Sequence, residues 1–168
     1  MHISPIIKTT TSWLLIFILY FNAGAQHYNS YQYFATKEGL PSNFIYKCTQ
    51  DAKGFLWIAT NAGVSRFDGK NFINYTVKQG LPENEISDIT NEKNGHIWVN
   101  CFQSSPCWYD EKQSSFINDK LDPALKKIRN SGIVYSAPSK SSDIIFYTTN
   151  QIFVKKGNEW ETINTEKI

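Results

Sequence analysis

A repeat of 41 residues constrains the fold of this chain more than any other feature of its sequence. Gly39-Leu40-Pro41 recurs as Gly80-Leu81-Pro82, and the same spacing holds for the residues that follow. The matched pairs are Asn43 with Asn84, Asp51 with Glu92, Gly54 with Gly95, and Trp57 with Trp98. Agreement at so many positions with one spacing indicates two copies of one structural unit.

A third, weaker copy follows at an offset of 88 to 89 residues from the first. It keeps an apolar run at Ile133-Val134-Tyr135 and another over residues 143–149, and Trp160 takes the place of Phe72. An insertion around residues 121–129 accounts for most of the longer offset. We therefore divide the repeat region into residues 37–77, 78–118 and 119–168.

Each unit has the pattern of four short strands. In the first unit, Asp51 and Gly54 stand where a type I turn prefers Asp and Gly. Residues 55–59 are apolar throughout, which is typical of a strand covered on both faces. Asp68-Gly69 predicts a two-residue type I′ hairpin turn. The Gly-Leu-Pro sequence at the start of each unit breaks regular structure, as a chain crossing from one sheet to the next requires.

Four strands in about 41 residues, repeated, are typical of the blades of a β-propeller. The sequence therefore predicts an all-β fold: a partial β-propeller of three four-stranded blades in an open arc. Residues 26–36 precede the first unit as a fourth strand would, so we predict an unpaired outer strand there and 13 strands in all. Trp57 and Trp98 are predicted to pack between neighbouring blades.

The first unit resembles the two-component regulator propeller repeat, on residues 39–43, 51–60 and 63–69. The second unit matches less fully, because residues 100–106 replace the turn in which a glycine is usual. The positions of the structural motif are Gly39, Leu40, Pro41, Asp51, Gly54, Trp57, Asp68, Gly69, Gly80, Leu81, Pro82, Gly95 and Trp98.

The resemblance implies a role in sensing. In that family, such repeats form the extracytoplasmic sensory part of bacterial hybrid histidine kinases and related receptors, often for carbohydrate breakdown products. Full-length members continue with a second propeller, a sandwich domain, a membrane helix and signalling domains. The resemblance therefore implies that these residues are an N-terminal fragment of a ligand-sensing module, and that the kinase activity belongs to other parts.

Residues 1–25 have the pattern of a secretory signal peptide. Their apolar run, residues 13–21, is shorter than the roughly 20 residues of a membrane-spanning helix. Ala23-Gly24-Ala25 supplies small residues for cleavage, so we expect cleavage between Ala25 and Gln26 and a periplasmic or otherwise extracytoplasmic protein. An uncleaved anchor or a buried helix is the alternative. We expect no membrane span apart from this segment.

Charge and residue types exclude several functions. The formal net charge is +2, and no run of like charges marks a nucleic-acid-binding surface. Of the three histidines, His2 lies in the signal segment, His27 at the expected mature start and His96 at a predicted strand start. No His and Cys residues have metal-ligand spacing. We therefore expect no enzyme activity, no metal and no cofactor.

The three cysteines, Cys48, Cys101 and Cys107, would lie in an oxidising compartment after export. Cys101 and Cys107 flank the loop that joins the second and third strands of the second unit. They could form a disulfide if the two strands place them opposite each other. The alternative, which we favour, is that both are buried free thiols. An odd number of cysteines leaves Cys48 unpaired in either case.

Three functions of different class are compatible with the sequence. The favoured one is a sensor module that binds a small ligand, with a glycan suspected, through loops at one edge of the blades. The second is a structural or protein-interaction propeller. The third is a propeller lyase or hydrolase, which the missing catalytic residues disfavour. Uncovered blade faces at the ends of an arc also predict contact with missing propeller blades or self-association.

Overall fold

The computed structural model describes residues 31–128, 134–140 and 144–165. The chain divides into two units, Met1–Tyr33 and Phe34–Ile168, and the following account concerns the second. The predicted signal peptide, residues 1–25, lies outside the described residues. None of the helices in the described part has the length and apolar character of a membrane span.

The second unit contains three antiparallel sheets, each of four strands in sequence order. The first sheet comprises β1 (Ile45–Gln50), β2 (Leu56–Thr60), β3 (Gly63–Phe67) and β4 (Phe72–Tyr75). The second comprises β5 (Ile86–Asn91), β6 (Ile97–Cys101), β7 (Cys107–Asp110) and β8 (Ser115–Ile117). The third comprises β9 (Tyr135–Pro138), β10 (Ile144–Tyr147), β11 (Gln151–Lys156) and β12 (Glu159–Asn164). The 3-10 segments are Thr36–Glu38, Val77–Gln79 and Pro123–Ile128.

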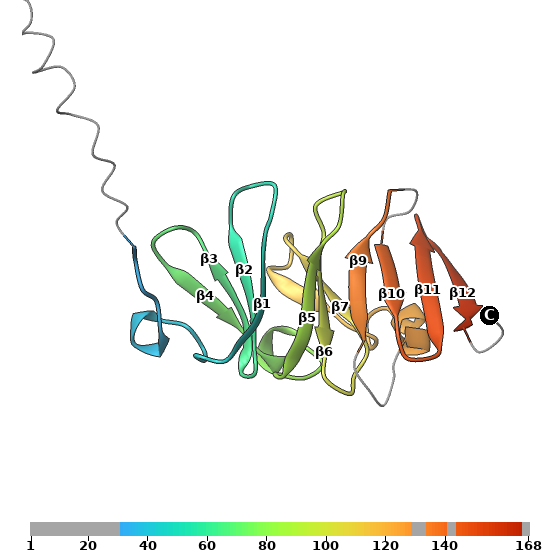
Figure 1. The fold of residues 1–168 in the computed structure, drawn as a ribbon, viewed down its shortest axis with the longest axis horizontal. Helices are drawn as coiled ribbons and strands as arrows, with labels where there is room; N and C mark the ends of the chain where they lie inside the picture. Colours follow the sequence, from blue (N-terminus) through green and yellow to red (C-terminus); the bar gives the residue numbers. More distant parts are fainter. Residues whose placement is uncertain (1–30, 129–133, 141–143, 166–168) are drawn as a thin grey trace, which may run out of the picture. The chain divides into compact units, whose positions relative to one another are not determined.

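The sheets follow one another in sequence, with the second between the first and the third (Figure 1). The first and second sheets enclose one apolar cluster, which includes Trp57 and Val99. The second and third enclose another, which includes Trp98 and Phe146. The Pro123–Ile128 segment of the insertion contributes buried side chains to this second cluster. Face-to-face packing of four-stranded meanders confirms the predicted partial propeller, and the described sheets do not close into a ring.

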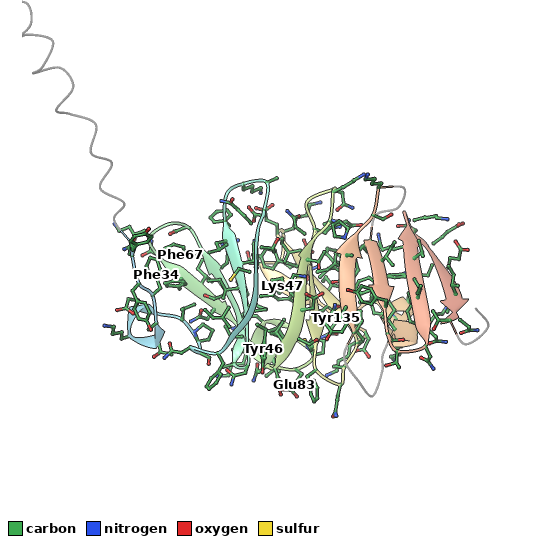
Figure 2. The ribbon with its side chains drawn as sticks, in the orientation of Figure 1. Phe34, Tyr46, Lys47, Phe67, Glu83 and Tyr135 are labelled. Carbon is green, nitrogen blue, oxygen red and sulfur yellow. The ribbon has the colours of Figure 1, made fainter. Side chains whose placement is uncertain are left out.

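The predicted outer strand before the first sheet is wrong for the residues that the structure describes. Residues 31–35 form no strand, and Thr36–Glu38 is a short 3-10 segment. An outer strand pairs with the third strand of a blade, and in each described sheet that position is already filled by the sheet's own fourth strand. Phe34 instead packs its ring against Phe67 and Phe72, with centroids 4.8 and 5.4 Å away (Figure 2). Twelve strands are therefore described rather than 13.

The Gly-Leu-Pro motif ends a 3-10 turn that precedes each of the first two sheets. Gly39 and Gly80 have φ angles of 113° and 94°, in the left-handed region that favours glycine. The leucine that follows each glycine is buried, being 5% exposed at Leu40 and 3% at Leu81. The repeated Gly-Leu-Pro motif therefore corresponds to a turn that places one leucine in the apolar interior.

Asparagine side chains fix this turn in both copies. The Oδ1 atom of Asn43 accepts a hydrogen bond from the backbone N–H of Thr36, and that of Asn84 accepts one from Val77, each at 3.0 Å. From the fourth strand, Asn74 donates through Nδ2 to the carbonyl of Gly39 at 2.8 Å. These bonds satisfy backbone groups that the turn would otherwise leave without partners.

An acidic side chain at the start of the first turn holds the tryptophan of the second strand. Asp51 Oδ2 accepts a hydrogen bond from Trp57 Nε1 at 2.7 Å, and Glu92 Oε2 accepts one from Trp98 Nε1 at 2.9 Å. Both indoles are 1% exposed, so an N–H without an acceptor would be costly there. We call this arrangement the acid–indole pair. It explains why an acid and a tryptophan recur together six residues apart.

The turn at Asp68-Gly69 is centred one residue later than predicted. Phe67 pairs with Phe72, and the N–H of Asp68 donates to the carbonyl of Asn71. The central residues are therefore Gly69, with φ of 97°, and Lys70, whose φ is not positive. Asp68 accepts hydrogen bonds from the N–H groups of Asn71 and Lys70, which hold the pKa of its carboxyl below the usual range. The aspartate thus caps the turn rather than forming its centre.

A polar junction joins the innermost strands of all three sheets. Asp88 on β5 is 3% exposed, and its Oδ1 lies 2.6 Å from Nζ of Lys47 on β1. Its Oδ2 accepts hydrogen bonds from the backbone N–H and the hydroxyl of Ser136 on β9, at 2.8 and 3.1 Å. One carboxylate therefore contacts both neighbouring sheets, and we call this set the three-sheet junction.

Candidate functional site

A hollow of about 420 Å³ lies between the first and second sheets, at the edge formed by their β1–β2, β5–β6 and β7–β8 turns. Its lining combines aromatic and charged side chains. The lining side chains include Lys53, Phe55, Arg66, Trp108, Tyr109 and Lys112. We call this hollow the inter-sheet groove. Aromatic rings beside a few polar groups are typical of sites for small ligands.

Arg66 on β3 lies among three aromatic rings of the groove. Its guanidinium carbon is 4.8 Å from the ring centroid of Phe55, 5.6 Å from that of Trp57 and 5.7 Å from that of Tyr109. Arg66 also donates from Nη1 to the hydroxyl of Tyr109 at 3.3 Å. The strand register explains this position, because Arg66 pairs directly with Trp57 across β2 and β3. Cation–π contact with three rings holds the guanidinium in place.

The carboxylates that line the groove have partners of their own. Asp51 accepts from Trp57 and from two backbone N–H groups of its turn. Asp110 accepts the N–H of Lys112, and Glu111 forms an ion pair with Lys53 across the rim. In the described part of the chain, no carboxylate lies within 4.0 Å of the Arg66 guanidinium.

Two tyrosines close the inner end of this region. The hydroxyls of Tyr75 and Tyr109 lie 3.2 Å apart, and both side chains are buried. Burial, followed by the hydrogen bond with Tyr109, raises the pKa of Tyr75 far above its usual value. Either hydroxyl can be the donor of the hydrogen bond between Tyr75 and Tyr109.

The opposite edge of the first two sheets carries two β-bulges. The register of β1 shifts between Ile45 and Lys47, and that of β5 shifts at the equivalent place, so Tyr46 lies in the first bulge. The Tyr46 hydroxyl donates to Glu85 Oε1 at 3.1 Å, and this bond raises the pKa of Tyr46. Tyr46, labelled in Figure 2, is 53% exposed. Bulges often aim side chains at functional positions.

Most of the predicted motif positions have structural roles, and three of them also line the groove: Asp51, Trp57 and Gly95. Sequence reasoning did not single out Arg66, Trp108 or Tyr109. The alternation of β3 was a usable signal, since it places Arg66 on the same face as Val64, toward the second sheet. Among the residues that the structure describes, no group of three or more His, Cys, Asp or Glu side chains could hold a metal ion.

All three cysteines are free thiols in the structure, so the disulfide considered between Cys101 and Cys107 is not formed. The register gives the reason. Cys107 pairs directly with Val99, which makes Cys101 its diagonal neighbour. Diagonal positions on paired strands are farther apart than the Cα separation that a disulfide usually spans. Burial, followed by the hydrogen bond with Cys101, raises the pKa of the Cys107 thiol well above its usual value.

Alkylation of the native protein by a maleimide is expected to modify Cys48 and to spare Cys101 and Cys107. Cys48 is exposed, whereas the other two are 0% exposed. After denaturation without reductant, intact-mass measurement should show all three thiols modified. A denatured mass with only one added group would instead show that Cys101 and Cys107 form a disulfide.

Comparison with known proteins concerns the repeat. Residues 39–62 match the two component regulator propeller family. The first unit is a two-component regulator propeller repeat. The match begins at Gly39 and ends within the β2–β3 turn, so the propeller repeat covers the Gly-Leu-Pro turn, Asn43 and the first acid–indole pair. The resemblance found in the sequence is therefore confirmed.

Solved structures that match part of the chain are extracellular domains ascribed to hybrid two component systems of B. thetaiotaomicron. That of BT4673 is 14% identical, with a TM-score of 0.48 over 74% of this chain and 25% of its own. That of BT3049 is 18% identical, with a TM-score of 0.31 over 80% of this chain and 25% of its own. The present chain thus spans about a quarter of the length of either. No curated protein sequence matches it.

Proposed function

We propose that this chain is part of the extracytoplasmic, ligand-sensing propeller of a two-component signal-transduction receptor, and that it contributes to binding a small carbohydrate-type ligand. The propeller repeat at residues 39–62 is the observation that carries the proposal. The inter-sheet groove supports it, because the half-buried ring of Phe55 can pack against the apolar face of a sugar. The same proposal includes export directed by residues 1–25 and the absence of enzyme activity from the residues of this chain.

Titration of the purified protein with a panel of oligosaccharides tests this function. We expect saturable binding of at least one saccharide, measured by calorimetry, and a rise in melting temperature at saturating ligand. A folded protein that binds no member of a broad panel would contradict the proposal.

A second candidate function, protein interaction, is favoured by the outward face of the third sheet. Tyr135 and Tyr147 pair across β9 and β10, with stacked rings 5.5 Å apart, and they are 44% and 42% exposed. Ile163 on β12 is 39% exposed. In the first two sheets the corresponding face is covered by the next sheet. Further propeller blades or a second copy of the chain are the partners that such a face would suit.

Analytical ultracentrifugation should therefore show self-association of the protein when it is produced from this chain alone. Replacing both Tyr135 and Tyr147 by serine is expected to shift the equilibrium toward monomer, because it removes exposed apolar area. Replacement of Tyr46, which is exposed on the first sheet, is the control and should leave the equilibrium unchanged. A wild-type protein that is monomeric at all concentrations would contradict this expectation.

A further inference from the structure

We propose that the inter-sheet groove binds an acidic saccharide, whose carboxylate or sulfate group pairs with Arg66 and whose ring lies against the aromatic lining. This inference rests on the proposed function, since it names the chemical class of ligand for the same module. Four observations carry it: the unused donors of Arg66, the way the guanidinium is held, the engagement of the neighbouring acids, and the half-buried ring of Phe55.

Arg66 has hydrogen-bonding capacity that the described residues do not use. A guanidinium carries five N–H donors. Among the described residues, its side chain makes one hydrogen bond, from Nη1 to the Tyr109 hydroxyl at 3.3 Å. Arg66 is half-buried, and no described carboxylate lies within salt-bridge distance. An anion in the groove could therefore take a fork of N–H donors without displacing a protein partner.

The guanidinium is also held in position before any ligand binds. The rings of Phe55, Trp57 and Tyr109 surround it at 4.8 to 5.7 Å. Strand pairing with Trp57 fixes the backbone of Arg66, and Trp57 is in turn fixed by its acid–indole pair. A donor that is already ordered loses little conformational entropy on binding, which favours affinity. A weakly hydrated guanidinium on aromatic faces is better suited than a lysine ammonium to serve as such an ordered donor.

The acids at the groove do not compete for Arg66, because each has other partners. Asp51 and Asp110 accept backbone N–H groups of their own turns, and Glu111 pairs with Lys53 at the rim. Lys112 adds an exposed positive charge to the lining. The cationic groups left for a ligand are therefore Arg66 in the groove and Lys112 at its mouth.

The aromatic lining indicates what accompanies the anion. Phe55 is half-buried and lines the groove, whereas the ring of Trp108 packs with Trp98 against the cluster between the second and third sheets. A volume of about 420 Å³ accommodates a molecule of one to two sugar rings. An acidic sugar combines an apolar ring face with a carboxylate or sulfate, which matches the rings and the guanidinium together. A small inorganic anion would use Arg66 but leave the rings without contact.

Fluorescence titration and calorimetry on the protein produced from the full chain test the inference. The probes are uronic acid disaccharides, a sulfated disaccharide and neutral disaccharides of the same size, which separates carboxylate from sulfate recognition. The variants are Arg66→Gln and Arg66→Lys. Lys78→Gln is the control, because it removes one positive charge from the exposed Val77–Gln79 segment, outside the groove. Near-UV circular dichroism reports whether each variant keeps its packed aromatic residues.

We expect an acidic disaccharide to bind, and Arg66→Gln to weaken that binding about tenfold or more, as loss of hydrogen bonds to a charged group implies. Arg66→Lys should also weaken the binding, because lysine lacks the planar fork of donors. If Arg66→Gln does not fold, the affinity of Arg66→Lys for the acidic disaccharide tests the role of Arg66. Lys78→Gln should bind as the wild type does.

Three outcomes would overturn the inference. The first is binding of acidic disaccharides that is unchanged in both Arg66 variants. The second is an equal loss in Lys78→Gln, which would indicate general attraction by net charge. The third is binding of neutral disaccharides alone, which would leave the proposed sensing function standing. If neither class binds to the folded protein, the proposed function fails together with this inference.

Discussion

Replacing Gly80 with alanine is expected to lower the free energy of unfolding by about 2 to 5 kcal/mol, because backbone strain and a steric clash add together. Gly80 has φ of 94°, and a Cβ atom there would lie 2.2 Å from the carbonyl oxygen of Phe116. That oxygen belongs to β8, so relief of the clash must move either the turn or the outer strand of the second sheet. Urea unfolding followed by tryptophan fluorescence measures the loss.

Gly95→Ala is the matched control for this prediction. Gly95 has a similar φ of 91°, but nothing lies within 4 Å of the position its Cβ would take. Only the conformational cost remains, about 1 to 2 kcal/mol. Equal destabilisation by the two substitutions would show that the approach of Gly80 to β8 is not what requires glycine.

Asp88→Ala is expected to destabilise the protein by about 1 to 3 kcal/mol, the cost of leaving buried hydrogen-bond donors without an acceptor, since the Lys47 side chain is 44% exposed and can be solvated. The substitution deprives Lys47 of its carboxylate and leaves the backbone N–H of Ser136 without its acceptor, whereas the Ser136 hydroxyl can still donate to Thr90 Oγ1. Because the three-sheet junction joins all three sheets, the loss should also broaden the unfolding transition. Calorimetry and urea unfolding measure both effects.

Two variants separate the causes of that loss. Asp88→Asn keeps an oxygen acceptor for Ser136 but loses the charge that faces Lys47, so it should destabilise less than the alanine variant. Lys53→Met removes an ion pair whose side chains are 59% and 64% exposed, and it should cost no more than about 1 kcal/mol. An effect of Asp88→Ala as small as that of Lys53→Met would contradict the role assigned to the junction.

The repeat predicted the sheets because it combines local turn chemistry with packing that recurs in every unit. Gly-Leu-Pro corresponds to a turn that buries a leucine, and the spacing of Asp51 and Trp57 corresponds to the acid–indole pair. Both features depend on residues close in the chain. For the same reason, the buried positions of Trp57 and Trp98 followed from the pattern alone.

The groove was not predictable in the same way, since it depends on contacts between repeats. Arg66 meets Tyr109 only when the first sheet packs on the second, and the two residues belong to different repeats. The missing outer strand has a similar cause, because strand formation depends on a pairing partner that the sequence around residues 26–36 does not reveal. Cys101 and Cys107 required the strand register, which differs by two residues from the one that would place them opposite each other.

The acid–indole pair occurs in the first two sheets, whereas β10 of the third sheet, Ile144–Tyr147, contains no tryptophan. The third sheet therefore lacks one hydrogen bond between a turn and a buried strand, and its outward face carries exposed tyrosines. Local opening should begin there, with β12 exchanging its amide hydrogens before β2 and β6. Under mild denaturant, the third sheet would then unfold before the second, so the sheets unfold in a defined order.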